Sequence, residues 1–170
     1  MNCPTLIAGV NYKETDDYPF VSLRKMAVTL PYDLGAKFLL KTGNQVLGYH
    51  DRGVLTVCEG YASDTYSPCI KRPWYIPGKS RYLHVTPVPK SAGFAPAILH
   101  DMTRQFFPVP GCPWTREDCD DWFYNMLLAG GESELIAGIY HEAVAGLTGD
   151  LWIAATRSSN AALSIQRTAY

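Results

Sequence analysis

The stretch FLLKTGNQVLGYHDRGVLTVCEGY, residues 38–61, decides the fold of the first half of the chain. Gly43-Asn44 lies between two apolar runs, and both residues tolerate the positive φ of a tight hairpin turn. A second turn at Asp51-Arg52-Gly53 leads into another apolar run. Residues 20–30 add a segment with β-branched and alternating character. We therefore expect a small antiparallel β-meander within a β-rich region, residues 1–62.

The second half of the chain has helical periodicity instead. Residues 92–107 (AGFAPAILHDMTRQFF) carry apolar side chains at the spacing of a helical stripe. Thr115 precedes an acidic turn, so we expect it to cap a second helix that ends at Gly130-Gly131. A third helix follows within ESELIAGIYHEAVAGL. Its larger apolar residues lie on one face: Leu135, Ile136, Ile139, Ala143 and Leu147.

A proline-rich segment, residues 63–91, separates these two halves. Proline removes backbone donors from a sheet and blocks helix interiors, so we expect an ordered loop here, with one short strand at 81–86. Residues 92–152 form the helical region, and residues 153–170 form a small polar tail. The sequence therefore predicts a single α+β domain over residues 1–170, in which the meander packs with about three helices.

Composition excludes several classes of protein. Of the 170 residues, 47% are apolar, which is an ordinary globular balance. The net charge of −1 argues against a surface built to trap nucleic acid or anionic lipid, so we expect neither as a partner. The five cysteines form no C-x-x-C pair, which favours reduced thiols over a disulfide framework. The sequence offers neither a signal peptide nor a membrane helix, and we expect synthesis in the cytoplasm of the cell that makes the protein.

Two carboxylates lie on apolar helix faces. Asp101 follows Ala97 and Ile98 by four and three residues, so it shares their buried stripe. Asp120 is spaced with Phe123 in the same way, and Arg116 precedes it by four residues. A carboxylate that faces a core is costly unless it is paired or bound. These positions therefore belong to a buried network or to a binding site.

Two interpretations of this polar group stay open. In the first, which we favour, a buried hydrogen-bond network pins loop and helices together, and no cofactor is needed; its members are Asp64, Ser67, His100, Asp101, Arg116 and Asp120. In the second, His100 is a base or a ligand of a divalent metal, and Asp101 and Asp120 are further ligands or orienting groups, with Asp64 as a fourth candidate. Ser67 lacks a G-x-S-x-G elbow, which argues against a catalytic triad.

The segment KRPWYIPGKSRYLHVTPVPK, residues 71–90, is basic and aromatic and contains no acidic residue. Such side chains anchor protein interfaces or stack on bases and sugars. Its candidate interaction residues are Lys71, Arg72, Trp74, Tyr75, Lys79, Arg81 and Tyr82. The alternatives are a solvated loop, or a loop that lies against the acidic start of the second helix, residues 117–121, in the same chain or in another copy.

Several motifs occur in an order that resembles a phage and prophage family known as domain of unknown function 1353. The matching residues are Gly60-Tyr61-Ala62-Ser63-Asp64 with Ser67-Pro68, then Ala97-Ile98-Leu99-His100-Asp101, then Arg116, Asp120 and Phe123, then Ile139-Tyr140 through Gly149 and Trp152. The resemblance covers roughly residues 50–152. In this chain Tyr61 replaces a phenylalanine, and residues 71–90 are a long insertion. The resemblance implies a phage origin.

These observations predict a virion-associated structural or accessory protein of a bacteriophage, in the tail or capsid region. It would act through protein–protein contacts with other virion proteins or with further copies of itself, rather than as an enzyme. One alternative is a metal-dependent hydrolase of cell wall or phosphoester that uses His100, Asp101 and Asp120. Another is a small inhibitor or binding protein that acts on a host target.

Overall fold

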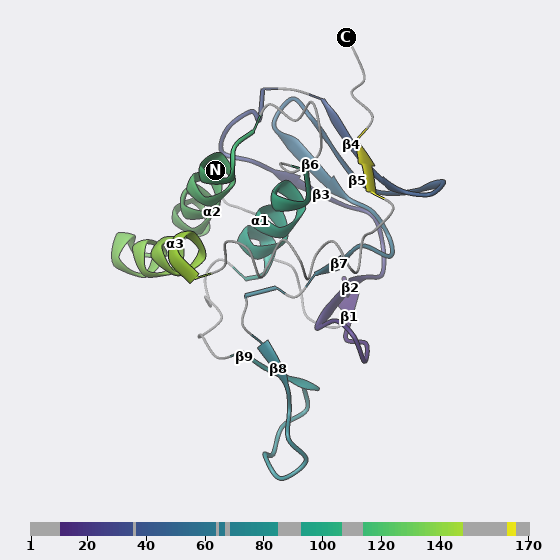
Figure 1. Cartoon of the computed structure of the whole chain (residues 1–170), viewed down its shortest axis with the longest axis vertical. Helices are drawn as coiled ribbons and strands as arrows, with labels where there is room; N and C mark the ends of the chain where they lie inside the picture. The colour runs from purple at the N-terminus through teal and green to yellow at the C-terminus, as the bar shows by residue number, and fades with distance from the viewer. Residues whose placement is uncertain are drawn as a thin grey trace.

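Strands fill the N-terminal half of the chain and helices the C-terminal half, which confirms the predicted α+β class (Figure 1). The computed structural model describes residues 11–35, 37–63, 65–66, 69–84, 93–106, 114–147 and 163–165. The strands are β1 (Tyr12–Lys13), β2 (Phe20–Ser22), β3 (Met26–Thr29), β4 (Phe38–Thr42), β5 (Gln45–Asp51), β6 (Val54–Val57), β7 (Ala62–Ser63), β8 (Cys69–Lys71), β9 (Tyr82–His84) and β10 (Leu163–Ile165). The helices are α1 (Ala95–Phe106), α2 (Arg116–Ala129) and α3 (Glu134–Leu147).

The predicted meander is the centre of a five-stranded antiparallel sheet with the order β10-β4-β5-β6-β3. Gly43, with φ of +56°, starts the two-residue turn between β4 and β5. Arg52 and Gly53 both have positive φ, as a type I′ hairpin turn requires. Residues 20–30 supply strands to two sheets, since β2 joins β1 and β7 in a separate sheet and β3 joins the meander.

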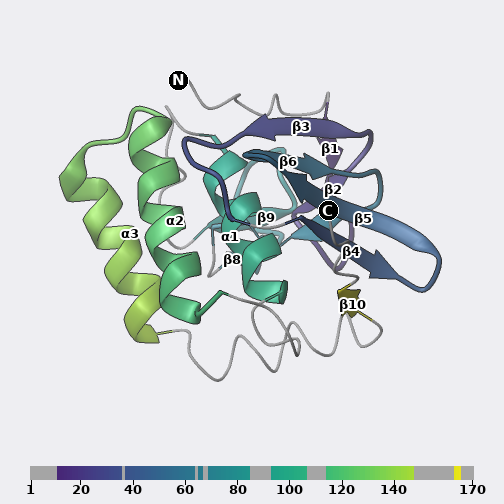
Figure 2. The ribbon, with the colours of Figure 1, turned by 90° about the horizontal axis from the view of Figure 1, so that it is seen from above.

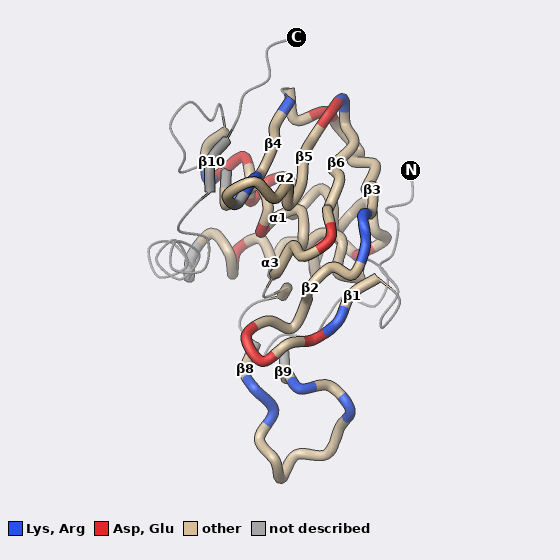
Figure 3. Tube along the Cα trace, turned by 90° about the vertical axis from the view of Figure 1, so that its right-hand side faces the viewer, with Lys and Arg blue, Asp and Glu red and all other residues tan. Residues whose placement is uncertain are grey.

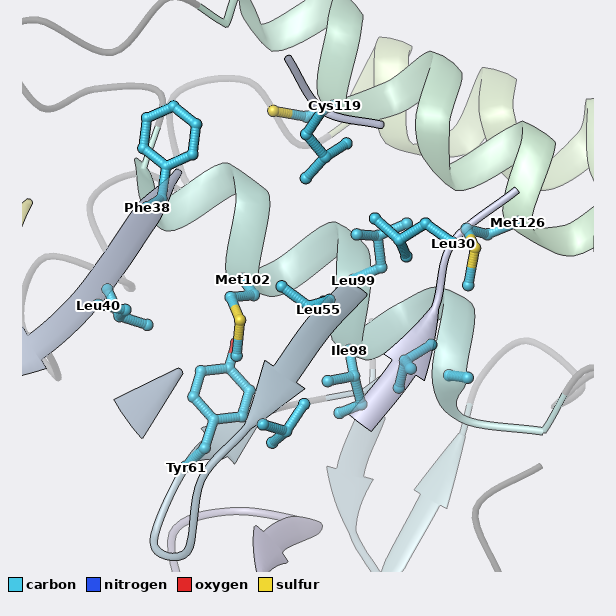
Figure 4. Packing of buried hydrophobic residues seen from close by; sticks show 14 of the residues in the cluster. Leu30, Phe38, Leu40, Leu55, Tyr61, Ile98, Leu99, Met102, Cys119 and Met126 are labelled. Carbon is cyan, nitrogen blue, oxygen red and sulfur yellow. The ribbon is translucent and has the colours of Figure 1, made fainter. Parts of the chain in front are cut away.

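The helices lie in succession on one side of the sheet, with α1 against the strands, α2 beyond it and α3 outermost (Figure 2). Leu99 and Met102 of α1 belong to one buried cluster with Leu40 and Leu55 of the sheet (Figure 4). Gly48 makes this approach close, since a Cβ atom there would lie 2.6 Å from Met102 Cε and 2.9 Å from the carbonyl oxygen of Thr56. The main core therefore lies between α1 and the five-stranded sheet.

The start of α2 matches the sequence prediction in detail. Thr115 Oγ1 accepts from the amide of Asp118 at 3.1 Å, and the Thr115 amide donates to Asp118 Oδ2 at 2.7 Å, which completes a capping box. The helix ends before Gly130, whose amide donates to Met126. Beside the cap, Trp114 Nε1 donates to the Leu34 carbonyl at 3.0 Å, so the N-terminal end of α2 is tied to the loop before β4.

The apolar stripe of α3 faces solvent. Leu135 is 73% exposed and Ile139 is 58% exposed, whereas Ala137 and Tyr140 face inward. Those inward residues form a second, smaller cluster with Phe123 of α2. The small Ala137 lets α3 approach α2 closely. The face of α3 that is buried is therefore the one with Ala137 and Tyr140, and not the apolar stripe that the periodicity predicts. Among the described residues, no helix is long and apolar enough to cross a bilayer.

The proline-rich segment is not a loop throughout, contrary to the prediction for residues 63–91. Strands β8 and β9 pair in antiparallel register to form a hairpin that projects from the body (Figure 1). We call this hairpin, residues 69–84, the arm. Strand β9 falls within the short strand expected at 81–86, but β8 was not expected. The predicted polar tail, residues 153–170, also contains a strand, since β10 pairs with β4.

Candidate functional site

The polar group between the helices centres on Asp120. Its carboxylate accepts hydrogen bonds from Arg104 Nη2 at 2.8 and 3.0 Å and from Arg104 Nε at 3.0 Å. His100 Nε2 lies 2.8 Å from Asp120 Oδ1 and is the donor of that bond, because an ionised carboxylate can only accept. Arg116 Nε lies 3.7 Å from Asp120 Oδ2. Asp120 and His100 are buried, so this is an ion cluster inside the protein.

Arg104 is the member of this cluster that the sequence interpretation missed. It is among the largest fully buried side chains in the described part of the chain. A signal for it was present, because Ala97, Asp101 and Arg104 follow the i, i+4, i+7 spacing of a single helix face. Arginine usually lies at the surface, so this spacing alone does not identify a buried side chain.

The cluster also reaches α3, which the prediction did not include. The carbonyl oxygen of Val144 accepts from Arg104 Nη2 at 3.3 Å and from Arg116 Nη2 at 3.0 Å. Arg116 Nη2 also donates to the Ala145 carbonyl at 2.9 Å. Carbonyls in the last turn of a helix lack helical partners, and a cation there is favoured by the helix dipole. The two guanidinium groups therefore join the C-terminal end of α3 to α1 and α2.

Asp101 has a different partner. The Ser63 hydroxyl of β7 donates to Asp101 Oδ2, and Ser63 Oγ accepts from the Thr65 amide at 2.9 Å. Thr65 is buried and has a φ of +58°, a backbone conformation that residues other than glycine rarely adopt. His100 Nδ1 is 4.0 Å from Asp101 Oδ1. Asp101 thus fixes the loop after β7 to α1, while the predicted members Asp64 and Ser67 lie outside the described residues.

The electrostatics of the cluster keep Asp120 ionised. Burial raises the pKa of its carboxyl, but the hydrogen bond and charge of His100, together with those of Arg104, outweigh burial and hold the pKa below its ordinary value. A carboxylate held in this way contributes to folding stability at neutral pH.

The buried side chains of this arrangement, His100, Arg104 and Asp120, bond to one another, and Arg104 also bonds to a helix carbonyl. Both carboxylate oxygens of Asp120 accept from Arg104 Nη2, and His100 Nε2 is engaged with the same carboxylate. No group of three His, Cys, Asp or Glu side chains in the described ranges could hold a metal. The contacts of His100, Asp101 and Asp120 are those of a buried hydrogen-bond network, and the metal-dependent hydrolase stays an alternative prediction.

The arm presents a second candidate site, a surface of aromatic and basic side chains. Trp74 is 95% exposed and Tyr75 is 68% exposed, and their rings meet edge to face at 5.8 Å. Lys71 and Lys79 are exposed beside them. Four of the seven predicted interaction residues, Lys71, Trp74, Tyr75 and Lys79, therefore lie on one accessible hairpin.

The other three candidates hold the arm in shape. Arg72 donates to the carbonyls of Ser80 at 2.6 Å and Pro77 at 2.8 Å, across the turn of the hairpin. The buried Tyr82 donates through its hydroxyl to the Thr15 carbonyl at 2.7 Å. Arg81 pairs with Asp16 at 2.7 Å. These contacts place the base of the arm against the β1–β2 turn.

Among the described residues, the acidic partner of the arm is this turn. Glu14 accepts from the Ser80 hydroxyl and, at 2.7 Å, from the Arg81 amide. In Figure 3 the acidic segment between β1 and β2 lies beside the base of the arm, whose basic residues continue outward. The expectation that the loop lies against residues 117–121 of its own chain is therefore not what the described contacts show.

Comparisons of the chain with protein-family models, with curated proteins and with solved structures give no match. The resemblance to the phage family stays a prediction from the motifs themselves.

Proposed function

We propose that the chain is a structural or accessory component of a bacteriophage particle, in its tail or capsid region, and that it works by protein–protein contact through the arm. The observation that carries the proposal is the exposure of Trp74 at the outer part of a hairpin that the protein holds in shape. The chain would be made in the host cytoplasm and then join the virion.

The composition of the arm is that of an interface anchor. Tryptophan, tyrosine and arginine are enriched among residues that dominate binding energy, and one buried tryptophan can contribute about 2 kcal/mol or more. Soluble proteins expose single apolar residues often, but Ile70, Trp74 and Tyr75 are all at least half exposed on one small hairpin. Burying these side chains against a partner would remove that apolar area from water.

The arm is also prepared for binding. The three carbonyl contacts of Arg72 and the contacts of Glu14 fix both strands before any partner arrives. Gly78 leaves space for this guanidinium, since a Cβ atom there would overlap Arg72 Nη1 in its present position. A segment that is ordered in advance loses less conformational entropy on binding. This order favours a docking element over a solvated loop.

The phage setting rests on the motif resemblance and on the polar network that those motifs form. His100, Asp101, Arg116 and Asp120 match the family pattern and lie in one buried network. Because His100, Asp101 and Asp120 are buried, the proposal places the contacts with partners at the surface of the protein.

The test is incorporation into phage particles. A phage that encodes the chain would be propagated with the wild-type gene, with Trp74→Ala, and with Leu23→Ala as a control. Leu23 is another exposed large hydrophobic residue, but it lies between β2 and β3. We expect wild type and Leu23→Ala in purified particles, and Trp74→Ala depleted at least tenfold despite equal amounts in the lysate. Finding the wild-type chain in lysates but never in particles would refute the proposal.

A further inference from the structure

The outer surface of α3 is apolar and has no cover among the described residues. Leu135, Ile136 and Ile139, which we call the α3 face, are all exposed. Figure 2 places α3 at the edge of the molecule, beside α2. Three neighbouring large aliphatic residues exposed on one helix are unusual for a surface that only meets water.

The charges around the α3 face are acidic. Glu134 and Glu142 are exposed on the same helix, and α3 contains no lysine or arginine. Over residues 114–147 there are seven acidic residues and a single basic one. The arm has the opposite character, with four basic residues and no acidic residue in 69–84. The same chain therefore carries two exposed apolar surfaces of opposite charge.

We propose that the α3 face receives the arm of a second copy, so that the chains associate head to tail. This inference rests on the proposed function, in which the arm is the contacting element, and it names the partner. Within one chain the two surfaces do not cover each other, because Trp74 and Leu135 are both largely exposed. The two surfaces are complementary between copies. Trp74 and Tyr75 of one copy would pack against the aliphatic side chains of the α3 face of the other, and Lys71 and Lys79 would lie beside its glutamates.

The alternative pairing of α3 with α3 is disfavoured by charge. It would bring Glu134 and Glu142 near the same residues of the second copy and would leave Trp74 exposed. A head-to-tail contact uses both surfaces and leaves one arm and one α3 face free at the ends of each dimer. Such a contact extends into a ring or a filament. This is the kind of assembly that tails and capsids contain.

Sedimentation velocity on the full chain tests the inference with two variants. Trp74→Ala removes the anchor of the arm, and Ile139→Lys places a cation on the α3 face, where the residue is 58% exposed and the fold should tolerate it. Circular dichroism would check folding, and Leu23→Ala is the control. We expect the wild type and the control to grow in mass with concentration, and each variant to associate more than about tenfold less.

The equimolar mixture of the two variants is the decisive sample. Ile139→Lys has an intact arm and Trp74→Ala has an intact α3 face, so the mixture should form a heterodimer that does not grow further. We also expect self-association of the wild type to fall between about 0.1 M and 1 M salt, as the Debye length falls from about 10 to 3 Å.

Three outcomes would overturn the inference. The first is association of Trp74→Ala at wild-type strength, which would indicate α3–α3 pairing. The second is failure of the mixture to associate. The third is a wild-type chain that stays monomeric at every concentration. None of these decides the proposed function, because Trp74→Ala could still be lost from phage particles through contact with another virion protein.

Discussion

Replacing Asp120 with asparagine tests whether the polar cluster is a structural network. Every group that the carboxylate meets is a donor: the Arg104 guanidinium, His100 Nε2 and, further off, Arg116. The asparagine side chain keeps the size of the aspartate, but it loses the charge and turns an NH2 group toward these donors. The variant Asp120→Asn therefore leaves a buried guanidinium without its counter-ion.

The expected loss is large for a conservative change. Breaking a buried ion pair by removing one partner costs about 3–5 kcal/mol. For a domain of this size each kcal/mol corresponds to about 2–4 °C in Tm, so Asp120→Asn should lower Tm by about 6–20 °C. The neighbouring Asp121 provides a matched control, because it is 67% exposed and pairs only with His141 in the described contacts, at 3.0 Å. An exposed pair contributes about 0–1 kcal/mol, so Asp121→Asn should lower Tm by at most about 4 °C.

Thermal and urea denaturation followed by circular dichroism measure the Tm and the free energy of unfolding of both variants against wild type. The double variant Arg104→Met with Asp120→Asn should recover part of the loss, because it removes the uncompensated cation together with its partner. Asp120→Asn that is as stable as Asp121→Asn, or more stable than wild type, would refute the structural interpretation. A stability gain is the behaviour of a strained functional carboxylate.

Three further predictions concern the same core. The pKa of Asp120 in the folded state lies below its unfolded value of about 3.9, so the carboxylate contributes its full stability above that pH and loses it as the pH falls through the folded pKa. The Tm of Asp120→Asn should therefore fall less on acidification than the Tm of wild type. Gly48→Ala should cost about 1–3 kcal/mol in urea melts by pushing Met102 from the sheet, while Gly138→Ala, which meets only open space, should be neutral or stabilising by up to about 1 kcal/mol. Added Zn²⁺ or Mn²⁺ should leave Tm unchanged, and a rise of several degrees would support the hydrolase alternative.

Features set by local chemistry could be predicted from the sequence. The turns after β4 and β5 need positive φ, which Gly43 and Gly53 supply, and the cap of α2 needs the hydroxyl of Thr115 with an acidic residue three positions later. These signals act within four residues, so they do not depend on the rest of the fold.

Features set by tertiary contact could not be predicted in this way. The orientation of α3 follows Ala137 and Tyr140, which meet α2, although the more apolar stripe is Leu135 and Ile139. Strand β8 forms only because β9 lies opposite it, and nothing near Ile70 signals this. Periodicity identifies an apolar face, but it does not say whether that face meets this chain or another molecule.

In the candidate site, too, some residues could be predicted from the sequence and others only from tertiary contacts. Asp101 and Asp120 stand out in the sequence because a carboxylate on an apolar stripe violates a simple expectation. Ser63, by contrast, is a small polar residue at the end of a strand, and only the fold brings it to Asp101 across 38 positions. The spacing of apolar residues identifies the two carboxylates of the buried network, and the structure is needed to find partners such as Arg104 and Ser63.

The polar cluster and the α3 face are connected through the last turn of α3. This helix buries few of its own residues, and its C-terminal end is tied to the body by the carbonyl contacts of Arg104 and Arg116 at Val144 and Ala145. An apolar core could hold the helix as strongly, but several directed hydrogen bonds also fix its rotation and its register. A helix that receives the arm of another copy must present Leu135 and Ile139 at a constant angle. A buried ion cluster is costly in free energy but sets that angle, which gives a physical reason for finding it beneath an exposed apolar surface.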